Sequence, residues 1–147
     1  MQNEMTITFL SVSENEAFAR TTVAAFISQL DPTLDEITEI KTVVSEAVTN
    51  AIIHGYNNEG TGYITIHCLL YNRDQVEITI EDEGVGISNI NKATEALYTS
   101  RPELERSGMG FTIMESFMDH MIVDSVVNVG TSIKLKKQLT SIQTVCH

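Results

Sequence analysis

The order of apolar and polar residues divides the chain into eight elements. Alternation with a period of two predicts strands, and apolar residues that recur every three or four positions predict helices. In chain order we expect a strand at 5–12, helices at 13–30 and 34–52, strands at 63–71 and 76–82, a helix at 110–118, and strands at 121–127 and 131–135.

This order predicts a two-layer α/β sandwich of the α+β kind. Tight turns join consecutive strands, so the sheet should be mixed and largely antiparallel, with the helices on one face only. We expect a single domain over residues 1–137 and a flexible tail over 138–147. Residues 87–107 have only a weak pattern, with a possible short helix near 92–97. A stretch of this length with little regular structure is typical of a functional lid.

Two of the predicted helices carry start signals. Ser13 is followed three residues later by Glu16, which predicts a capping box at the start of the first helix. The break Asp31-Pro32-Thr33 precedes the second helix, where proline suits the first turn.

Charge and composition limit the partners. The 147 residues carry a formal net charge of −11, which argues against nucleic acid and favours a basic partner. No apolar run is long enough to span a membrane, and the first residues do not resemble a secretory signal. Cys68 and Cys146 are too few for a disulfide framework, so we expect a reducing, cytoplasmic location.

Glu46 and Asn50 lie four residues apart in the second predicted helix. That spacing places both side chains on one helix face, one turn apart. Asn50 offers a neutral oxygen that suits Mg²⁺ when phosphates and water supply the other ligands. Glu46 could deprotonate or orient a nucleophile. The pair alone is also typical of a solvated helix edge.

Asp82 closes an alternating strand and precedes Gly84 and Gly86. A carboxylate at a strand end can accept a hydrogen bond from the exocyclic amine of adenine, whereas guanine has a carbonyl there. The glycines would let the main chain approach the base and ribose. Alone, the stretch is equally typical of an acidic turn.

A third stretch, Ser107-Gly108-Met109-Gly110, opens the helix predicted at 110–118. Main-chain N–H groups at such a helix start can face phosphates. Arg106 could neutralise a terminal phosphate. No Walker A pattern is present, which excludes the usual P-loop enzymes.

In this order, the three stretches resemble the N, G1 and G2 boxes of the GHKL superfamily, the Bergerat-fold ATPases. The resemblance covers roughly residues 5–136. Residues 15–20 and 46–56 are similar to the anti-sigma factor serine kinases, and residues 103–115 are most similar to the sporulation branch of that family.

The resemblance implies ATP or ADP and Mg²⁺ as ligands, and a homodimer. Its partners would be a sigma factor of the sigma F type and an anti-anti-sigma protein that is phosphorylated on serine. The implied catalytic residues are Glu46 as general base and Arg106 at the terminal phosphate, with Arg20 as the partner-docking residue. The implied nucleotide and metal residues are Asn50 on Mg²⁺, Asp82 on adenine, and Gly84, Gly86, Ser107, Gly108, Met109, Gly110 and Thr131 around the pocket.

Three other interpretations stay open from the sequence. The chain could be a histidine-kinase catalytic domain, although it lacks a hairpin with a phosphoacceptor histidine. It could be a nucleotide-gated binding module without catalysis. It could also be an interaction domain that binds no nucleotide.

Overall fold

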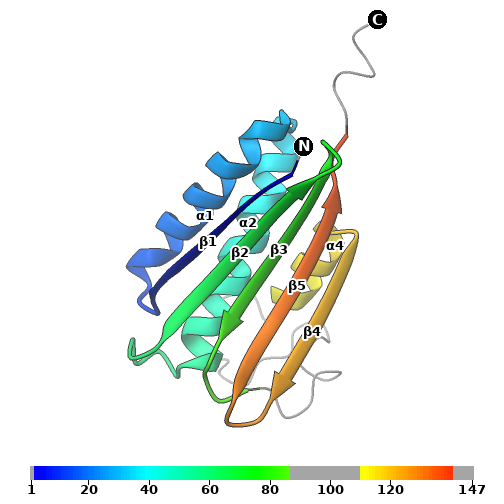
Figure 1. The fold of residues 1–147 in the computed structure, drawn as a ribbon. Helices are drawn as coiled ribbons and strands as arrows, with labels where there is room; N and C mark the ends of the chain where they lie inside the picture. Colours follow the sequence, from blue (N-terminus) through cyan, green and yellow to red (C-terminus); the bar gives the residue numbers. More distant parts are fainter. Residues whose placement is uncertain (1, 87–109, 141–147) are drawn as a thin grey trace, which may run out of the picture.

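A computed structural model describes residues 2–86 and 110–140 of the chain (Figure 1). The strands are β1 (Asn3–Leu10), β2 (Tyr63–Tyr71), β3 (Gln75–Asp82), β4 (His120–Val126) and β5 (Gly130–Gln138). The helices are α1 (Glu14–Ile27), α2 (Leu34–Asn50) and α4 (Gly110–Phe117), with a 3₁₀ turn η1 (Ser28–Leu30) after α1 and a π-helical turn η2 (Ala51–Gly55) after α2.

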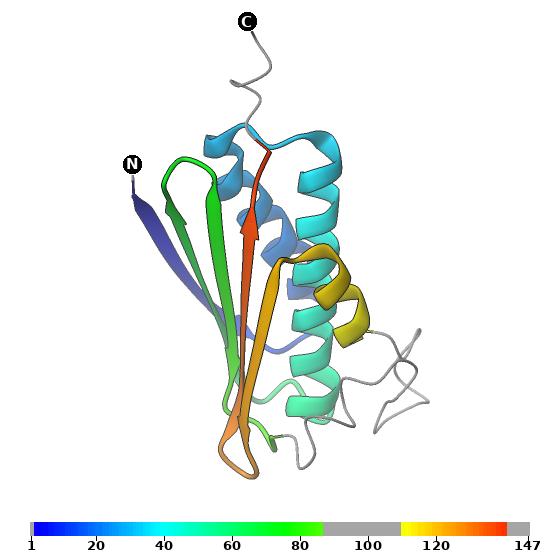
Figure 2. The same cartoon turned by 90° about the vertical axis from the view of Figure 1, so that its right-hand side faces the viewer.

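The five strands form one sheet in the order β1-β2-β3-β5-β4. Each neighbouring pair is antiparallel. Figure 2 shows α1, α2 and α4 on one face of this sheet. The predicted two-layer sandwich with helices on one face is therefore confirmed. The sheet was expected to be mixed and largely antiparallel, and all of its described strand pairs are antiparallel.

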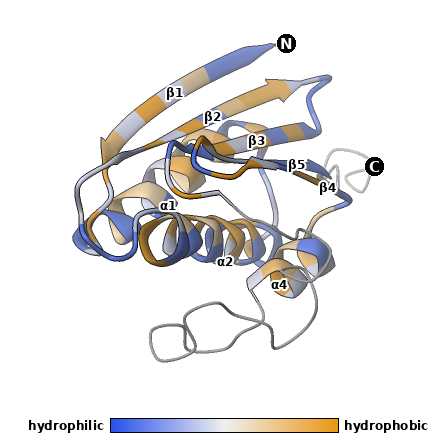
Figure 3. Cartoon of the chain, turned by 90° about the horizontal axis from the view of Figure 1, so that it is seen from below, coloured by the Kyte–Doolittle hydropathy of each residue, from blue (hydrophilic) through white to orange (hydrophobic). Residues whose placement is uncertain are grey.

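The core lies between the two layers, because strands and helices each place one apolar face there (Figure 3). Alternate residues of β2 and β3 are buried, as a half-exposed sheet requires. Cys68 is one of them, and burial raises the pKa of its thiol to about 12. That thiol therefore packs as a small apolar side chain.

The capping box predicted at the start of α1 is wrong. Ser13 makes no side-chain capping bond and has helical backbone angles. Its partner in the prediction, Glu16, instead accepts hydrogen bonds from Arg20 and from Ser45 of α2. A glutamate that can reach a cation and a neighbouring helix therefore does not fold back onto its own helix start.

A capping box is present at the start of α2. The Glu36 N–H donates to Thr33 Oγ1 at 3.1 Å, and the Thr33 N–H donates to Glu36 Oε1 at 2.8 Å. The second oxygen of Glu36 accepts the Thr140 N–H at 2.7 Å. Leu139, beside it, is buried. Hence the chain beyond β5 is attached to the start of α2 as far as Thr140, and 141–147 of the predicted tail lie outside the described residues.

Burial by itself would raise the pKa of Glu36, but the hydrogen bonds from Thr140 and Thr33 outweigh it and lower that pKa. A carboxylate with a lowered folded-state pKa stabilises the fold above its unfolded pKa, and this stability is lost as the pH falls through the folded value.

We therefore expect Glu36→Gln to lower the free energy of unfolding at pH 7 by about 1 kcal/mol. The difference from the parent protein should shrink as the pH falls through the acid range where Glu36 protonates. Denaturant melts at several pH values measure this. Glu39→Gln is the control on the same helix, because the Glu39 pair with Lys137 is partly exposed and such pairs contribute about 0–1 kcal/mol. A pH-independent loss in Glu36→Gln would contradict the assignment.

Candidate nucleotide site

The predicted site residues of the sheet gather at one end of the molecule, the lower end in Figure 1. β3 ends there at Asp82, which lies opposite Thr131 near the start of β5. α2 ends there as well, through η2. The antiparallel register thus brings together residues that are far apart in the sequence.

The Asp82 carboxylate lies directly against the end of η2. A β-carbon placed on Gly55 would be 2.9 Å from Asp82 Oδ1. The Gly84 N–H donates to Oδ1 at 2.9 Å. Burial raises the pKa of Asp82, and main-chain hydrogen bonds from Gly84 and Thr131 partly oppose this. The result is a partly buried carboxyl group with a fixed orientation at the strand end.

Gly84 and Gly86 are required by contacts within the chain itself. A β-carbon on Gly84 would lie 2.0 Å from the carbonyl oxygen of Gly55. Gly86 has φ +77°, and its β-carbon would lie 2.4 Å from the carbonyl oxygen of Val126. The Val85 N–H donates to the Gly55 carbonyl at 2.9 Å, and the Asn128 N–H donates to the Val85 carbonyl at 2.7 Å. The turn after β3 is thus fastened both to η2 and to the β4–β5 turn.

Thr131 is buried beside this turn, with 8% of its surface exposed. Its hydroxyl shares a 2.8 Å hydrogen bond with the hydroxyl of Ser125 on β4. Ser125 also donates to the Gly130 carbonyl at 3.1 Å. These bonds fix the start of β5, and so the position of Thr131 next to Asp82.

Glu46 and Asn50 lie on the last turns of α2, as the spacing predicts. The side-chain nitrogen of Asn50 is buried and has no hydrogen-bond partner within the described part of the chain. Buried polar groups are almost always hydrogen-bonded, so this amide fits a ligand that the described chain does not supply. A half-turn of the amide plane would present its oxygen instead, the atom that suits Mg²⁺.

The π-helical turn η2 directly follows Asn50. Such turns are rare and occur frequently at functional sites. Here its five residues connect Asn50 to Gly55, the residue against which Asp82 lies. The two predicted ligand residues are therefore connected through one short, well-packed segment.

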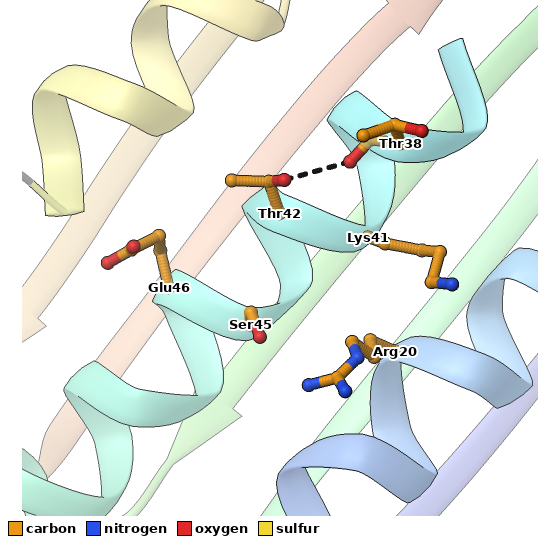
Figure 4. Close-up of a pocket in the computed structure, with 6 residues that line it drawn as sticks. All are labelled: Arg20, Thr38, Lys41, Thr42, Ser45 and Glu46. Atoms are coloured by element: carbon orange, nitrogen blue, oxygen red, sulfur yellow. Dashed lines mark hydrogen bonds between the residues drawn. The ribbon is translucent and has the colours of Figure 1, made fainter. Parts of the chain in front are cut away.

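Arg20 lies on α1, on the other side of α2 from α4, beside a groove of about 380 Å³ that Thr38, Lys41, Thr42, Ser45 and Glu46 also line. Figure 4 shows Arg20 and Lys41 on the side of α1, whereas Glu46 projects from α2 to the opposite side. Glu16 holds Arg20 in an ion pair that leaves 37% of the arginine side chain exposed. The structure thus places Arg20 apart from Asp82 but next to the helix that carries Glu46.

Part of the predicted phosphate-binding stretch lies outside the described residues, namely Arg106, Ser107, Gly108 and Met109, as does the predicted lid. Gly110 is described, and it is the buried first residue of α4. α4 packs beside α2. The helix start expected to face phosphates is therefore next to the helix that carries Asn50.

Sequence reasoning assigned no role to Gly55, which lies against Asp82, to Tyr56, which bonds the residue after Asp82, or to Ser45, which bonds Glu16. The Tyr56 hydroxyl accepts the Glu83 N–H and donates to the Tyr63 carbonyl. A sequence pattern does not show hydrogen bonds to main-chain atoms. The only signal for Gly55 and Tyr56 was therefore their position just after the helix pattern ends.

None of the helices in 2–86 and 110–140 is long and apolar enough to cross a membrane. Within the same residues, no cluster of three histidine, cysteine or acidic side chains could hold a metal ion. The role of Asn50 as a ligand of Mg²⁺ stays a prediction.

Comparisons with known proteins identify the family and the fold. Residues 11–137 match the family model described as "Histidine kinase-like ATPase domain". The chain is 64% identical to an anti-sigma F factor of Oceanobacillus iheyensis, over 99% of each chain. It is 60% identical to an anti-sigma F factor of Geobacillus sp. (strain WCH70), over the full length of both.

A solved structure shares the fold at low sequence identity. The structure of the RsbU and RsbW domains of Rv1364c from Mycobacterium tuberculosis matches 93% of this chain and 32% of its own chain, with a TM-score of 0.68 and 18% identity. This match shows the fold, and the full-length relatives show the family. The chain belongs to the anti-sigma F factor family and carries its histidine kinase-like ATPase domain.

Proposed function

We propose that this protein binds Mg-ATP at the end of the sheet where Asp82 and Asn50 lie, sequesters a sigma factor of the sigma F type, and phosphorylates a serine of an anti-anti-sigma protein. The observation that carries the nucleotide part is the side-chain nitrogen of Asn50, which is buried and has no hydrogen-bond partner among the described residues, and η2 connects Asn50 to the residue against which Asp82 lies. The names of the full-length relatives support the anti-sigma part.

Asp82 would recognise adenine. Its carboxylate is held by the Gly84 N–H and would accept a hydrogen bond from the exocyclic amine of the base. Thr131, which is buried opposite Asp82 on β5, would border the adenine-binding site on that side. Asn50 would hold Mg²⁺ through its side-chain oxygen. Mg²⁺, when bound, offsets the negative charge of the phosphates and holds them in place.

Glu46 would act as the general base. The serine hydroxyl of the partner attacks the terminal phosphorus of ATP, its proton passes to the Glu46 carboxylate, and the bond between that phosphorus and the bridging oxygen breaks to release ADP. Glu46 lies one helical turn before Asn50, so the base and the metal ligand share one rigid helix. Arg106 would stabilise the charge on the transferred phosphoryl group.

The groove between α1 and α2 would receive the protein partners. Arg20 and Lys41 supply positive charge there, in a chain whose formal net charge is −11. Glu46 also lines this groove, but its side chain projects to the other side of α2, so a partner docked on Arg20 would have to reach across α2 to the proposed base. We further propose that the protein acts as a homodimer in the cytoplasm.

Phosphate transfer from γ-labelled Mg-ATP to a candidate anti-anti-sigma protein tests the function. We expect acid-stable label on a serine of the partner. Glu46→Gln should bind nucleotide and sigma factor normally but lose transfer by about 10²–10⁴-fold. Glu39→Gln, the same change earlier on α2, is the matched control and should keep the parent rate.

Three outcomes would overturn parts of this proposal. Acid-labile label would indicate histidine chemistry. Tight ATP binding without label on the partner would indicate a nucleotide-gated binding module. Transfer at the parent rate by Glu46→Gln would remove that residue from the role of base.

Asn50→Ala should lose the Mg²⁺-dependent part of ATP affinity, by at least about tenfold. Titrations of ATP with Mg²⁺ and with EDTA measure this part directly, and the EDTA value serves as the internal control. Equal affinity of the variant and the parent protein under both conditions would refute the metal-ligand role.

Asp82→Asn should reduce the preference for ATP over GTP by at least about tenfold, because its amide can donate to the guanine carbonyl. The same variant should affect stability in a pH-dependent way. The raised pKa of Asp82 means that protonation stabilises the folded parent protein, and this contribution is lost as the pH rises through the folded value. The asparagine variant should therefore gain stability relative to the parent as the pH rises. Nucleotide competition and melts between pH 4 and pH 8 check both effects.

A further inference from the structure

The Tyr56 hydroxyl joins three segments of the site. It donates to the Tyr63 carbonyl at the start of β2, at 2.7 Å. It accepts the Glu83 N–H, directly after Asp82, also at 2.7 Å. Tyr56 itself follows η2, and its own N–H donates to the Ala51 carbonyl at 3.0 Å. One residue thus connects the end of η2, the first residue of β2 and the turn that follows β3.

These bonds hold the turn after Asp82 from both sides. Before Gly84, the Glu83 N–H is held by Tyr56. After Gly84, the Val85 N–H is held by the Gly55 carbonyl at 2.9 Å. Between them, the Gly84 N–H points to the Asp82 carboxylate at 2.9 Å. The orientation of that carboxylate therefore depends on two anchors, one from the main chain and one from the Tyr56 hydroxyl.

The ring of Tyr56 is fixed as well. A β-carbon on Gly62 would lie 2.1 Å from Tyr56 Cε1, so the ring lies directly over that residue. The side chain is partly buried and packs against the hydrophobic core. Because the ring is held in place, the Tyr56 hydroxyl is fixed at one position and can in turn fix the position of the Glu83 N–H.

We propose that Tyr56 is a positioning residue for base recognition, which sets the Asp82 carboxylate at the angle that accepts the exocyclic amine of adenine. This rests on the proposed function of Asp82. In this role Tyr56 would act through the turn rather than through the base itself. Without its hydroxyl, the Glu83 N–H and the Tyr63 carbonyl lose the bridge between them, and the turn before Gly84 loses one of its two anchors.

The test compares two nucleotides on three proteins. Purine riboside 5′-triphosphate lacks only the exocyclic amine of ATP, so its affinity relative to ATP reports that one hydrogen bond. Equilibrium binding of both, with Mg²⁺, is measured for the parent protein, Tyr56→Phe and Tyr63→Phe. Tyr63→Phe is the matched control, because it removes a hydroxyl from an exposed ring and keeps the main-chain carbonyl that Tyr56 uses.

We expect the parent protein and Tyr63→Phe to prefer ATP by about tenfold or more, and Tyr56→Phe to prefer it by about threefold or less. The preference is a ratio of two affinities, so a change in the folded fraction cancels. Gly62→Ala is a second variant with the same expected effect, because it displaces the ring and leaves the hydroxyl in place.

The outcomes separate this inference from the function on which it rests. If the parent protein binds both nucleotides equally, Asp82 does not read the amine, and both proposals fail. If the parent prefers ATP and Tyr56→Phe keeps the full preference, the role of Tyr56 alone is wrong. An equal loss of affinity for both nucleotides in Tyr56→Phe would make Tyr56 a structural residue and would also overturn the inference.

Discussion

The close approach of Gly55 to Gly84 is the constraint on which the rest of the site depends. Here the helical layer and the sheet meet main chain to main chain, with 2.0 Å between the Gly55 oxygen and the place where a β-carbon of Gly84 would be. Any side chain at Gly84 would push η2 away from β3. Such a shift would uncover Asp82, break the Val85 bond to Gly55, and separate Asn50 from Asp82.

A chain with a net charge of −11 repels the phosphates of a nucleotide, so a nucleotide site on it needs local groups that favour negative charge. In the proposed function, the metal and the phosphates are held by a neutral amide, Asn50, by main-chain N–H groups at the start of α4 and by Arg106. Arg20 and Lys41 line the groove beside α1. Nucleotide and protein partner would then bind on two sides of α2, each to its own set of charges and dipoles.

Much of the fold could be predicted from the sequence because its periodicity is strong. The alternation in β2 and β3 and the helical repeat in α2 both correspond to one buried face. The capping box shows the limit: Ser13 and Thr33 both precede a glutamate by three residues, yet only Thr33 makes the motif. The difference lies in two partners of Glu16: Arg20, its neighbour four residues on along α1, and Ser45 of α2, a tertiary partner that no local pattern contains.

The positions of the predicted site residues follow from the same periodicity, whereas their roles stay predictions. Spacing along one helix places Glu46 and Asn50, and the strand end places Asp82. Sequence reasoning explained Gly84 and Gly86 by approach to a nucleotide, whereas their described contacts are with the chain's own carbonyls. The role of Tyr56 stayed hidden, since both partners of its hydroxyl are main-chain atoms.

The register of the sheet has a practical consequence for handling this protein. Asn3 pairs with Leu70, and Gln138 pairs with Gln75, so residues 3 and 138 lie at the same end of the sheet. Asp82 lies at the other end of β3, seven residues from Gln75, or about 23 Å at the usual rise of a strand. A fluorophore placed at Asn3 or Gln138 would therefore start far from the end where we propose that the base binds.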